Sequence, residues 1–259
     1  MKVIILCGGK GYRLKEETEF KPKPMVQVGG KPILWHIMKI YAHYGFNDFI
    51  IALGYKGEMI KEYFLNEQHY AHNFTLNTKS GKTKLYKKHI RRDNFKITFV
   101  DTGEETLPGE RILKIKAYIP KEDQNFMVTY GDGVGNVDIK KLLKFHRKQG
   151  TIGTIIGVRP RSKYGLIALS PKNSTIIKNF VEKPVLKEWV NGGFMVFKKQ
   201  FFKYLRPGEM EWDALKRLTE EEQLSLYAHD GFWHSMDTYP DVDNLNKLWA
   251  DNPEWKVWK

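Results

Sequence analysis

Short apolar runs alternate with amphipathic segments along the first 150 residues of the chain. Residues Lys2–Cys7 and Phe49–Leu53 are continuous apolar runs of strand length, which is typical of strands buried on both faces of a sheet. Between them, apolar residues recur at helical spacing from Pro32 until Gly45, which predicts a helix over this stretch. The same patterns predict strands at Phe95–Val100 and Phe126–Tyr130, and helices at Gly57–Phe64, Arg111–Tyr118 and Asp138–Lys148.

This alternation indicates an α/β fold with a Rossmann-like, three-layer, mostly parallel sheet, whose ligand site lies at the carboxyl ends of the strands. The later part of the chain reads differently. Thr151–Val158, Ser174–Val181 and Gly193–Phe197 look like strands joined by loops, which predicts a mixed-sheet extension, and Asn244–Ala250 lies in a closing helix. No internal repeat or low-complexity linker is present, so we expect a single domain over residues 1–259, with a core in 1–150 and a second part in 151–259.

One segment has an unusual charge pattern. Lys79–Arg92 carries seven basic residues and no acidic one around a Ser80-Gly81 turn, and its alternation predicts a protruding β-hairpin arm. A solvated arm or a subunit contact is the favoured interpretation. Nucleic-acid contact is less favoured, because Tyr86 is its single aromatic residue and cannot form a stacking platform.

Composition changes this picture little. Hydrophobic residues make up 41% of the 259 residues and charged residues 28%, which is ordinary for a soluble globular protein. No stretch of 18 apolar residues and no signal-peptide cleavage site are present, and Cys7 is the single cysteine, so we expect a cytoplasmic protein without a membrane span. The net charge of +13 fits nucleic-acid binding, polyanionic substrates or a merely solvated lysine-rich surface, and composition does not decide among them.

Candidate chemistry begins directly after the first predicted strand, at Gly8-Gly9-Lys10-Gly11, which Arg13 follows. Glycines at this place let the backbone approach a phosphate closely, and exposed amides then bind the anion. The segment is neither of the common phosphate loops, because Lys10 and Arg13 occupy the second and third glycine positions of G-x-G-x-x-G. Further on, Lys23 stands between two prolines that fix its backbone, which suits a positioned charge.

These pieces belong to a longer ordered series. The chain contains G-G-x-G-x-R-L, K-P-K-P-M, V-G-G-K-P-I, G-D-G, E-K-P, N-G-G-F and M-D-T, and in this it resembles the sugar-phosphate nucleotidylyltransferases. The resemblance covers nearly the whole chain. It is greatest to the branch of glucose-1-phosphate cytidylyltransferases, on the basis of Glu16-Glu17-Thr18, Trp35–Lys39, Gly54–Gly57 and Gly231-Phe232-Trp233.

The resemblance implies a reaction in which an oxygen of the acceptor's phosphate attacks the α-phosphorus of CTP in line and pyrophosphate leaves. Two anions must meet, so the protein has to neutralise charge and align the reactants. Arg13 and Lys23 are implied as catalytic residues. The implied nucleotide-binding residues are Leu6, Gly8, Gly9, Gly11, Tyr12, Thr102, Gly109, Arg111 and Gly131.

The resemblance also implies a metal site and an acceptor site. Asp132 in G-D-G and Asp237 in M-D-T would bind Mg²⁺ together with phosphate oxygens and water. The implied partners are CTP and a phosphorylated small-molecule acceptor, with no nucleic acid and no membrane, and relatives form homo-oligomers. The implied acceptor-binding residues are Tyr164, Gly165, Glu182, Lys183, Asn191 and Gly192.

Three departures from the family pattern bear on specificity. Tyr12 replaces a small threonine, Glu110 replaces the second glycine of a Gly-Gly-Arg motif, and Met210–Leu215 replaces a stretch ending in Glu-Pro-Leu. Added acid would favour an acceptor that carries an amine. Glucose 1-phosphate is still the first expectation for the acceptor, because the resemblance to this branch implies it. Phosphoglutamine, which a relative uses in capsule modification, and another sugar phosphate remain open as acceptors. A catalytically silent regulatory subunit on the same fold is the alternative of another class, although such proteins usually lose the metal aspartate or the loop lysine.

Overall fold

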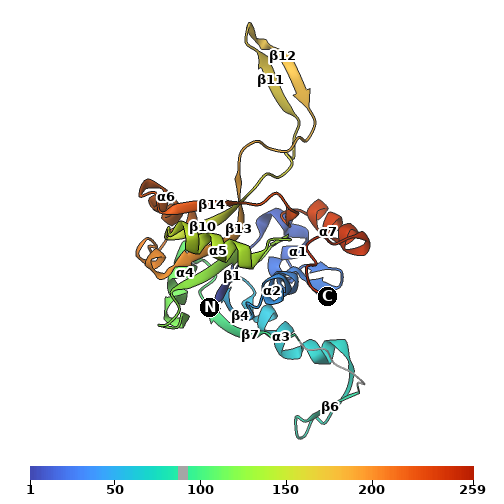
Figure 1. Ribbon diagram of the computed structural model, residues 1–259. Coiled ribbons are helices and arrows are strands. Elements are labelled where there is room, and N and C mark those ends of the chain that lie inside the picture. Colours follow the sequence, from blue (N-terminus) through green and yellow to red (C-terminus); the bar gives the residue numbers. More distant parts are fainter. Residues whose placement is uncertain (87–92) are drawn as a thin grey trace.

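The computed structural model describes residues 1–86 and 93–259, and in this part of the chain seven strands form one central sheet (Figure 1). Their order is β14-β10-β13-β8-β1-β4-β7. All of them run in the same direction except β13, which is antiparallel to both of its neighbours. The strands are β1 (Val3–Cys7), β4 (Asp48–Leu53), β7 (Lys96–Asp101), β8 (Asn125–Tyr130), β10 (Gly153–Val158), β13 (Val190–Lys198) and β14 (Leu224–Ala228).

Helices cover both faces of this sheet, so the fold has three layers (Figure 1). Successive side chains of β1 alternate between the faces: Val3 and Ile5 belong to one buried cluster and Ile4 to the other. The first cluster lies under α2 (Ile33–His43), α3 (Gly57–Ala71), α5 (Ile139–Gln149) and α7 (Tyr239–Asp251), and the second under α4 (Pro108–Ile115) and α6 (Glu211–Glu220).

Short elements connect these layers. The short helical segments in the described part of the chain include η1 (Tyr12–Leu14), α1 (Lys15–Thr18), η2 (Lys23–Met25), η3 (Lys116–Tyr118) and η4 (Lys199–Lys203). Two short antiparallel pairs join β2 (Gln27–Val28) to β3 (Lys31–Pro32) and β9 (Gly133–Gly135) to β15 (Trp233–Ser235).

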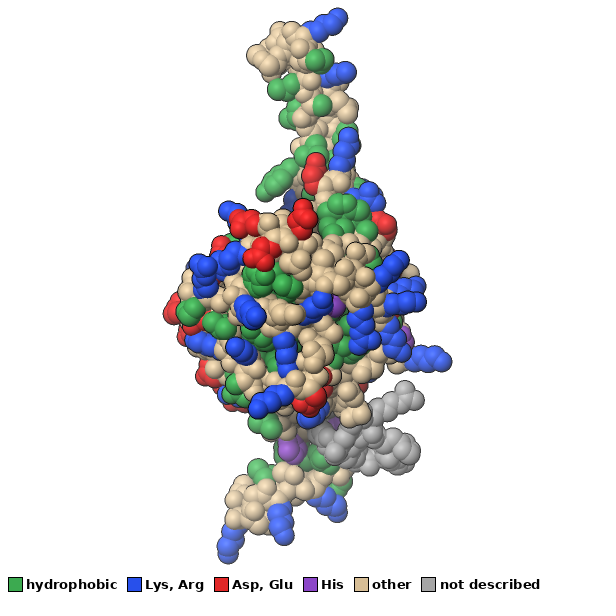
Figure 2. All heavy atoms as spheres, turned by 60° about the vertical axis from the view of Figure 1, so that its left-hand side comes forward, with side chains coloured by type: hydrophobic (Ala, Val, Ile, Leu, Met, Phe, Trp, Pro, Cys, Tyr) green, Lys and Arg blue, Asp and Glu red, His purple; other side chains and the backbone are tan. Residues whose placement is uncertain are grey.

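One expectation from the sequence was wrong. Ser174–Val181 was expected in the mixed-sheet extension, but β12 (Asn173–Val181) pairs with β11 (Leu166–Ser170) in a hairpin that stands clear of the body (Figure 1). Every residue of β12 is exposed, and Figure 2 shows hydrophobic side chains along this hairpin at the top of the molecule. The hairpin 166–181 is called the apolar ribbon below. Its exposed large hydrophobic residues are Leu166, Ile167, Leu169, Ile176, Ile177, Phe180 and Val181.

A second hairpin corresponds to part of the predicted basic arm. β5 (Asn73–Leu76) pairs with β6 (Thr83–Tyr86), and Gly81 in the turn has a φ of 69°, which favours glycine. The hairpin begins earlier than expected. The remainder of the predicted segment, residues 87–92, lies outside the described residues.

The fold class predicted from the sequence is confirmed: a mostly parallel α/β sheet continues into a mixed part through β13, β10 and β14. The predicted strand and helix positions agree closely, with α3 seven residues longer than expected and Asp138 capping α5 by accepting a hydrogen bond from the Lys141 amide. No helix within residues 1–86 and 93–259 is long and apolar enough to cross a membrane.

Two buried histidines hold distant parts of the fold together. His36 on α2 has one ring nitrogen 2.8 Å from the Val28 carbonyl oxygen, and the Trp255 indole donates to the other. His146 on α5 lies 2.8 Å from the hydroxyl of Thr154 in β10. Burial lowers the pKa of each imidazole to about 4.

These pKa values predict how stability depends on pH. The folded-state pKa lies below the unfolded value of about 6.5, so the unfolded chain binds protons more readily between pH 6.5 and 4. Stability is therefore complete above pH 6.5 and falls by about 3 kcal/mol per histidine as the pH drops to 4. Chemical denaturation of the wild type across this range, compared with His146→Gln, measures the loss. The variant should have a shallower slope, while replacement of the surface residue His43 by glutamine should leave the slope unchanged; equal slopes for all three proteins would contradict the prediction.

Candidate active site

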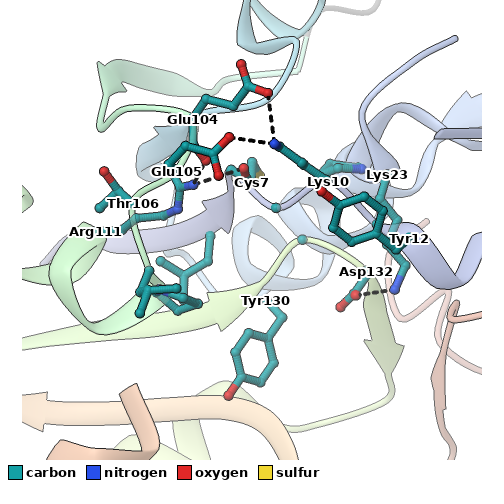
Figure 3. Close-up of a pocket in the computed structure, with 18 of the residues that line it drawn as sticks. Cys7, Lys10, Tyr12, Lys23, Glu104, Glu105, Thr106, Arg111, Tyr130 and Asp132 are labelled. Carbon is teal, nitrogen blue, oxygen red and sulfur yellow. Dashed lines mark hydrogen bonds and ion pairs between the residues drawn. The ribbon is translucent and has the colours of Figure 1, made fainter. Parts of the chain in front are cut away.

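A cavity of about 540 Å³ opens at the carboxyl ends of β1 and β8, where the parallel sheet was expected to bind its ligand (Figure 3). This volume suits a small molecule of nucleotide size. Its walls come from the segment after β1, the segment after β7 and the end of β8. The predicted site residues that line it are Leu6, Gly8, Gly9, Gly11, Tyr12, Arg13, Lys23, Arg111, Gly131 and Asp132.

The glycine loop, Gly8–Gly11, is shaped by close packing. A Cβ at Gly8 would lie 2.1 Å from the Arg111 guanidinium, so this position accepts only glycine in the present arrangement. Gly11 has a φ of 66°, and a Cβ there would lie 2.8 Å from Thr18. The Thr18 hydroxyl donates to the Gly11 carbonyl at 3.1 Å and so fixes the end of the loop.

Arg111 has a structural place beside the cavity. Its buried guanidinium donates to the backbone carbonyls of Gly8, Leu53 and Gly103, at 3.0, 3.0 and 2.7 Å. It also donates to the Thr102 hydroxyl at 2.6 Å. These acceptors lie at the end of β4 and in the segments after β1 and β7, so one side chain holds three neighbouring parts of the chain together, with its hydrogen bonds directed to the protein.

Two other predicted nucleotide-binding residues lie behind the cavity wall. The Thr102 hydroxyl is buried and donates to the Leu53 carbonyl oxygen at 2.6 Å. Gly109, near the start of α4, packs against the chain before α6: a Cβ there would lie 2.7 Å from the Met210 carbonyl oxygen. Both residues shape the wall rather than line the cavity.

The two predicted metal ligands are brought together by the short β9–β15 pair. Asp132 directly precedes β9, and Asp237 follows β15 by two residues, so antiparallel pairing places both at the same end. Lys23 Nζ lies between them, 2.7 Å from Asp132 Oδ2 and 2.9 Å from Asp237 Oδ1. Figure 3 shows the contact of Lys23 with Asp132. Arg13 adds a second cation, 2.8 Å from Asp237 Oδ1. Four residues distant in sequence thus form one charge cluster.

The electrostatics of this cluster follow from burial and pairing. Lys23 is only 8% exposed, and although burial lowers its pKa, the charges and hydrogen bonds of Asp132 and Asp237 outweigh burial and raise it. Burial raises the pKa of Asp237, but Lys23 and Arg13 outweigh this effect and keep it below its ordinary value. Lys23 is therefore charged and Asp237 ionised at neutral pH.

The carboxylate pair, Asp132 and Asp237, fits a divalent cation. Both carboxylates already point at one positive atom, Lys23 Nζ, which stands where a cation bound by both would lie. Their oxygens are the ligands that Mg²⁺ prefers. No group of three or more histidine, cysteine or acidic residues within residues 1–86 and 93–259 could hold a metal, so phosphate oxygens and water would have to complete its coordination.

The cavity mouth contains residues that sequence reasoning did not select. Lys10 Nζ lies 2.5 Å from Glu105 and 3.5 Å from Glu104, so an ion-pair bridge joins the glycine loop to the segment after β7 (Figure 3). Tyr12, by contrast, was predicted, and it lines the mouth with 76% of its surface exposed. The sequence shows a lysine inside a glycine-rich loop, but it does not show which acidic residues this lysine pairs with.

The predicted acceptor-binding residues divide into two groups. Tyr164, Gly165, Glu182 and Lys183 lie at the root of the apolar ribbon and do not line the cavity. Lys183 has a φ of 45°, an unusual conformation for a lysine.

The other group lies beside the cavity. The Gly192 carbonyl accepts a hydrogen bond from the Trp233 indole at 2.8 Å. The Asn191 amide nitrogen lies 3.4 Å from the hydroxyl of Tyr130, a cavity-lining residue. Tyr130 and its partner Glu211 were not selected from the sequence, although Tyr130 directly precedes the G-D-G motif.

Comparison with known proteins shows the family to which the chain belongs. A family model described as nucleotidyl transferase matches residues 2–255. The chain is 42% identical over 262 residues to a Bacillus subtilis (strain 168) protein named "Probable glucose-1-phosphate cytidylyltransferase", with 100% of both chains covered. It is 38% identical over 263 residues to the glucose-1-phosphate cytidylyltransferase of Salmonella typhi, again with 100% of both chains covered. A solved structure of UDP-glucose pyrophosphorylase with UDP-glucose has a TM-score of 0.68 at 18% identity, covering 96% of this chain and 98% of that chain, and shows the same fold.

The charge cluster predicts that Lys23 competes with a divalent cation for the carboxylate pair. Lys23→Met removes the competing ammonium, so the nucleotide-free variant should bind Mn²⁺ about tenfold more tightly than the wild type, which corresponds to about 1.4 kcal/mol. Titration calorimetry with Mn²⁺ alone measures this. Lys31→Met, which removes a similar ion pair with Glu67 away from the cavity, is the matched control and should bind like the wild type. Equal or weaker binding by Lys23→Met would show that the ammonium does not occupy the cation position.

Proposed function

The chain belongs to the nucleotidyl transferase family, and from this we propose that it transfers CMP from CTP to glucose 1-phosphate, giving CDP-glucose and pyrophosphate. The single observation that carries the proposal is the Lys23 ammonium held between Asp132 and Asp237 at the edge of a nucleotide-sized cavity. The choice of CTP and glucose 1-phosphate is supported by the names of the two full-length relatives.

The site supplies what this chemistry needs. An oxygen of the acceptor phosphate forms a bond to the α-phosphorus of CTP, and the bond from that phosphorus to the pyrophosphate oxygen breaks. Both reactants are anions, so the barrier falls when fixed cations and amides surround the phosphates. Three cationic residues line the cavity: Lys10 within the glycine loop, and Arg13 and Lys23 after it. No side chain has to act as a covalent nucleophile.

Mg²⁺ is the proposed cofactor, with Asp132 and Asp237 as its protein ligands. When bound, Mg²⁺ would neutralise negative charge on the phosphates. In the absence of that ion, Lys23 and Arg13 compensate the charge of the carboxylate pair. Both side chains can then turn to phosphate oxygens, because Arg13 is largely exposed and Lys23 borders the cavity.

A sugar phosphate is favoured over phosphoglutamine as the acceptor. The argument for an amine rested on added acid near the acceptor, above all at Glu110. In the structure, Glu110 accepts a hydrogen bond from the Gly208 amide at 2.9 Å, in the segment before α6, and pairs with Lys114 at 3.1 Å. It therefore presents no free carboxylate to an acceptor amine.

We also propose that the chain acts in the cytoplasm as a homo-oligomer whose subunits meet through the apolar ribbon. A two-stranded hairpin with apolar side chains on exposed positions is expected to be covered by another surface. A second copy of the chain is the proposed partner. The ribbon carries four predicted acceptor residues at its root, which supports a link between assembly and the acceptor site.

Pyrophosphate release with Mg²⁺ tests the function. CTP, UTP, ATP and GTP are each combined with glucose 1-phosphate, another hexose 1-phosphate and phosphoglutamine. Release with CTP and glucose 1-phosphate is the expected result, and release with CTP and phosphoglutamine would replace the proposed acceptor. No release with any pair would favour a regulatory protein on this fold.

Asp132→Asn tests the metal assignment. Loss of one carboxylate from the pair should lower kcat by about three orders of magnitude, with the circular dichroism spectrum unchanged. Asp243→Asn, which removes a surface carboxylate paired with Lys247 on α7, is the control and should keep full activity. Substantial activity in Asp132→Asn would contradict the assignment.

Light scattering after gel filtration tests the oligomer. The wild type should have the mass of two or more chains of 30.4 kDa each. The double variant Ile177→Asp/Phe180→Asp places charges on the apolar ribbon and should dissociate into monomers. Lys178→Ser, at a polar position on the same strand, should remain assembled. A monomeric wild type at micromolar concentration would overturn the proposal.

A further inference from the structure

A buried acid lies next to the active-site cavity without a complete set of partners. Glu211, the first residue of α6, is 5% exposed. Its Oε1 accepts a hydrogen bond from the Tyr130 hydroxyl at 2.6 Å, while Oε2 is buried and has no hydrogen-bond partner among the described residues. A buried polar atom left without a partner costs stability. A buried polar atom without a partner calls for an explanation, and a role in the neighbouring site is one.

Tyr130 connects this acid to both parts of the active site. It is the last residue of β8, directly before Gly131 and Asp132, and it lines the cavity. In Figure 3 its ring points away from the glycine loop. The ring packs on the backbone of Gly193, where a Cβ would lie 2.6 Å from Tyr130 Cδ2. The N-G-G segment of β13 thus packs against the tyrosine ring.

The chemistry of the donors and acceptors fixes the direction of each hydrogen bond. The Tyr130 hydroxyl donates its proton to Glu211 Oε1. The tyrosine oxygen can then accept from the Asn191 amide nitrogen, 3.4 Å away. The Asn191 Oδ1 accepts from the Gly193 backbone amide at 2.9 Å. The amide is therefore held in one orientation from both ends.

The relay of Glu211, Tyr130 and Asn191 leaves Asn191 with one free amide proton and one free lone pair. These groups can hydrogen-bond a hydroxyl group of a sugar.

We infer that Glu211 is a positioning residue for the transfer reaction: through Tyr130 it fixes the orientation in which Asn191 meets the hydroxyl groups of the acceptor. The inference rests on the proposed function and adds to it a residue that touches neither substrate. It assigns the effect to the acceptor: Tyr130 lines the cavity, but its hydroxyl bonds to Glu211 and Asn191, and neither of these two residues lines it.

A double-mutant cycle on kinetics tests this assignment. Tyr130→Phe keeps the ring and removes the hydroxyl, so the KM for the acceptor should rise about tenfold while the KM for CTP changes less than twofold. Asn191→Ala should raise the acceptor KM at least as much. The double variant should be no worse than Asn191→Ala alone, because Tyr130 acts through that residue. Full additivity, or a change in the KM for CTP instead, would overturn the inference.

Variants of Glu211 and a matched tyrosine complete the test. Glu211→Gln retains a carbonyl oxygen that accepts from Tyr130, so its acceptor KM should stay within about threefold of the wild type, whereas Glu211→Leu should behave like Tyr130→Phe. Tyr204→Phe is the control, since Tyr204 donates to Glu221 in a similar tyrosine–glutamate pair on the surface. It should leave the acceptor KM unchanged. A loss in Glu211→Gln equal to that in Glu211→Leu would overturn the hydrogen-bond mechanism.

Equilibrium unfolding separates this inference from the proposed function. Tyr130→Phe and Glu211→Leu are each unfolded in denaturant without substrates, together with the double variant. The relay predicts that the two effects on stability are not additive, because both variants remove the same hydrogen bond. If the wild type transfers CMP to no acceptor, the proposed function fails and this cycle decides whether the relay exists. Additive effects would overturn it.

Discussion

The active site depends on one ammonium group placed between two carboxylates. Asp132 and Asp237 would repel each other if they were left alone at this distance, and Lys23 converts that repulsion into attraction. The backbone of Lys23 is fixed by its neighbouring prolines, and Asp237 is anchored by Asp241, which accepts a hydrogen bond from the Asp237 amide at 3.0 Å. The loop after β1, the end of β8 and the start of α7 therefore meet at one ion cluster. The walls of the cavity keep their places because of this cluster.

Much of the central sheet could be predicted from the sequence, because its strands are buried on both faces. β1 is apolar throughout, β4 is apolar after its first residue, Asp48, and α2 between them carries apolar residues at helical spacing. The position of Asp132 at the end of a strand also follows from such a pattern. Its pairing with Asp237 came from family resemblance alone. β9 and β15 have three residues each, which is too short for any periodicity to reveal that they bring the two residues together.

The features that could not be predicted from the sequence are those that depend on which other part of the protein a residue contacts. β12 carries two pairs of apolar residues, Ile176-Ile177 and Phe180-Val181, and the sequence does not say which surface covers them. Arg111 was predicted to bind the nucleotide and does line the cavity, but its hydrogen bonds to carbonyls after β1, at the end of β4 and after β7 could not be predicted from the sequence. Glu211 stood out only as a departure from the family pattern. Its importance becomes visible when Tyr130 and Asn191 are seen to lie beside it.

The apolar ribbon also has a consequence for the life of a newly synthesised chain. An isolated two-stranded hairpin is at best marginally stable in water, so the ribbon can open locally while the central sheet remains folded. Until its apolar side chains are covered, both of its open edges are exposed to chaperones, proteases and other unfolded chains. The yield of intact protein should therefore depend on how quickly the ribbon is covered as well as on the stability of the core.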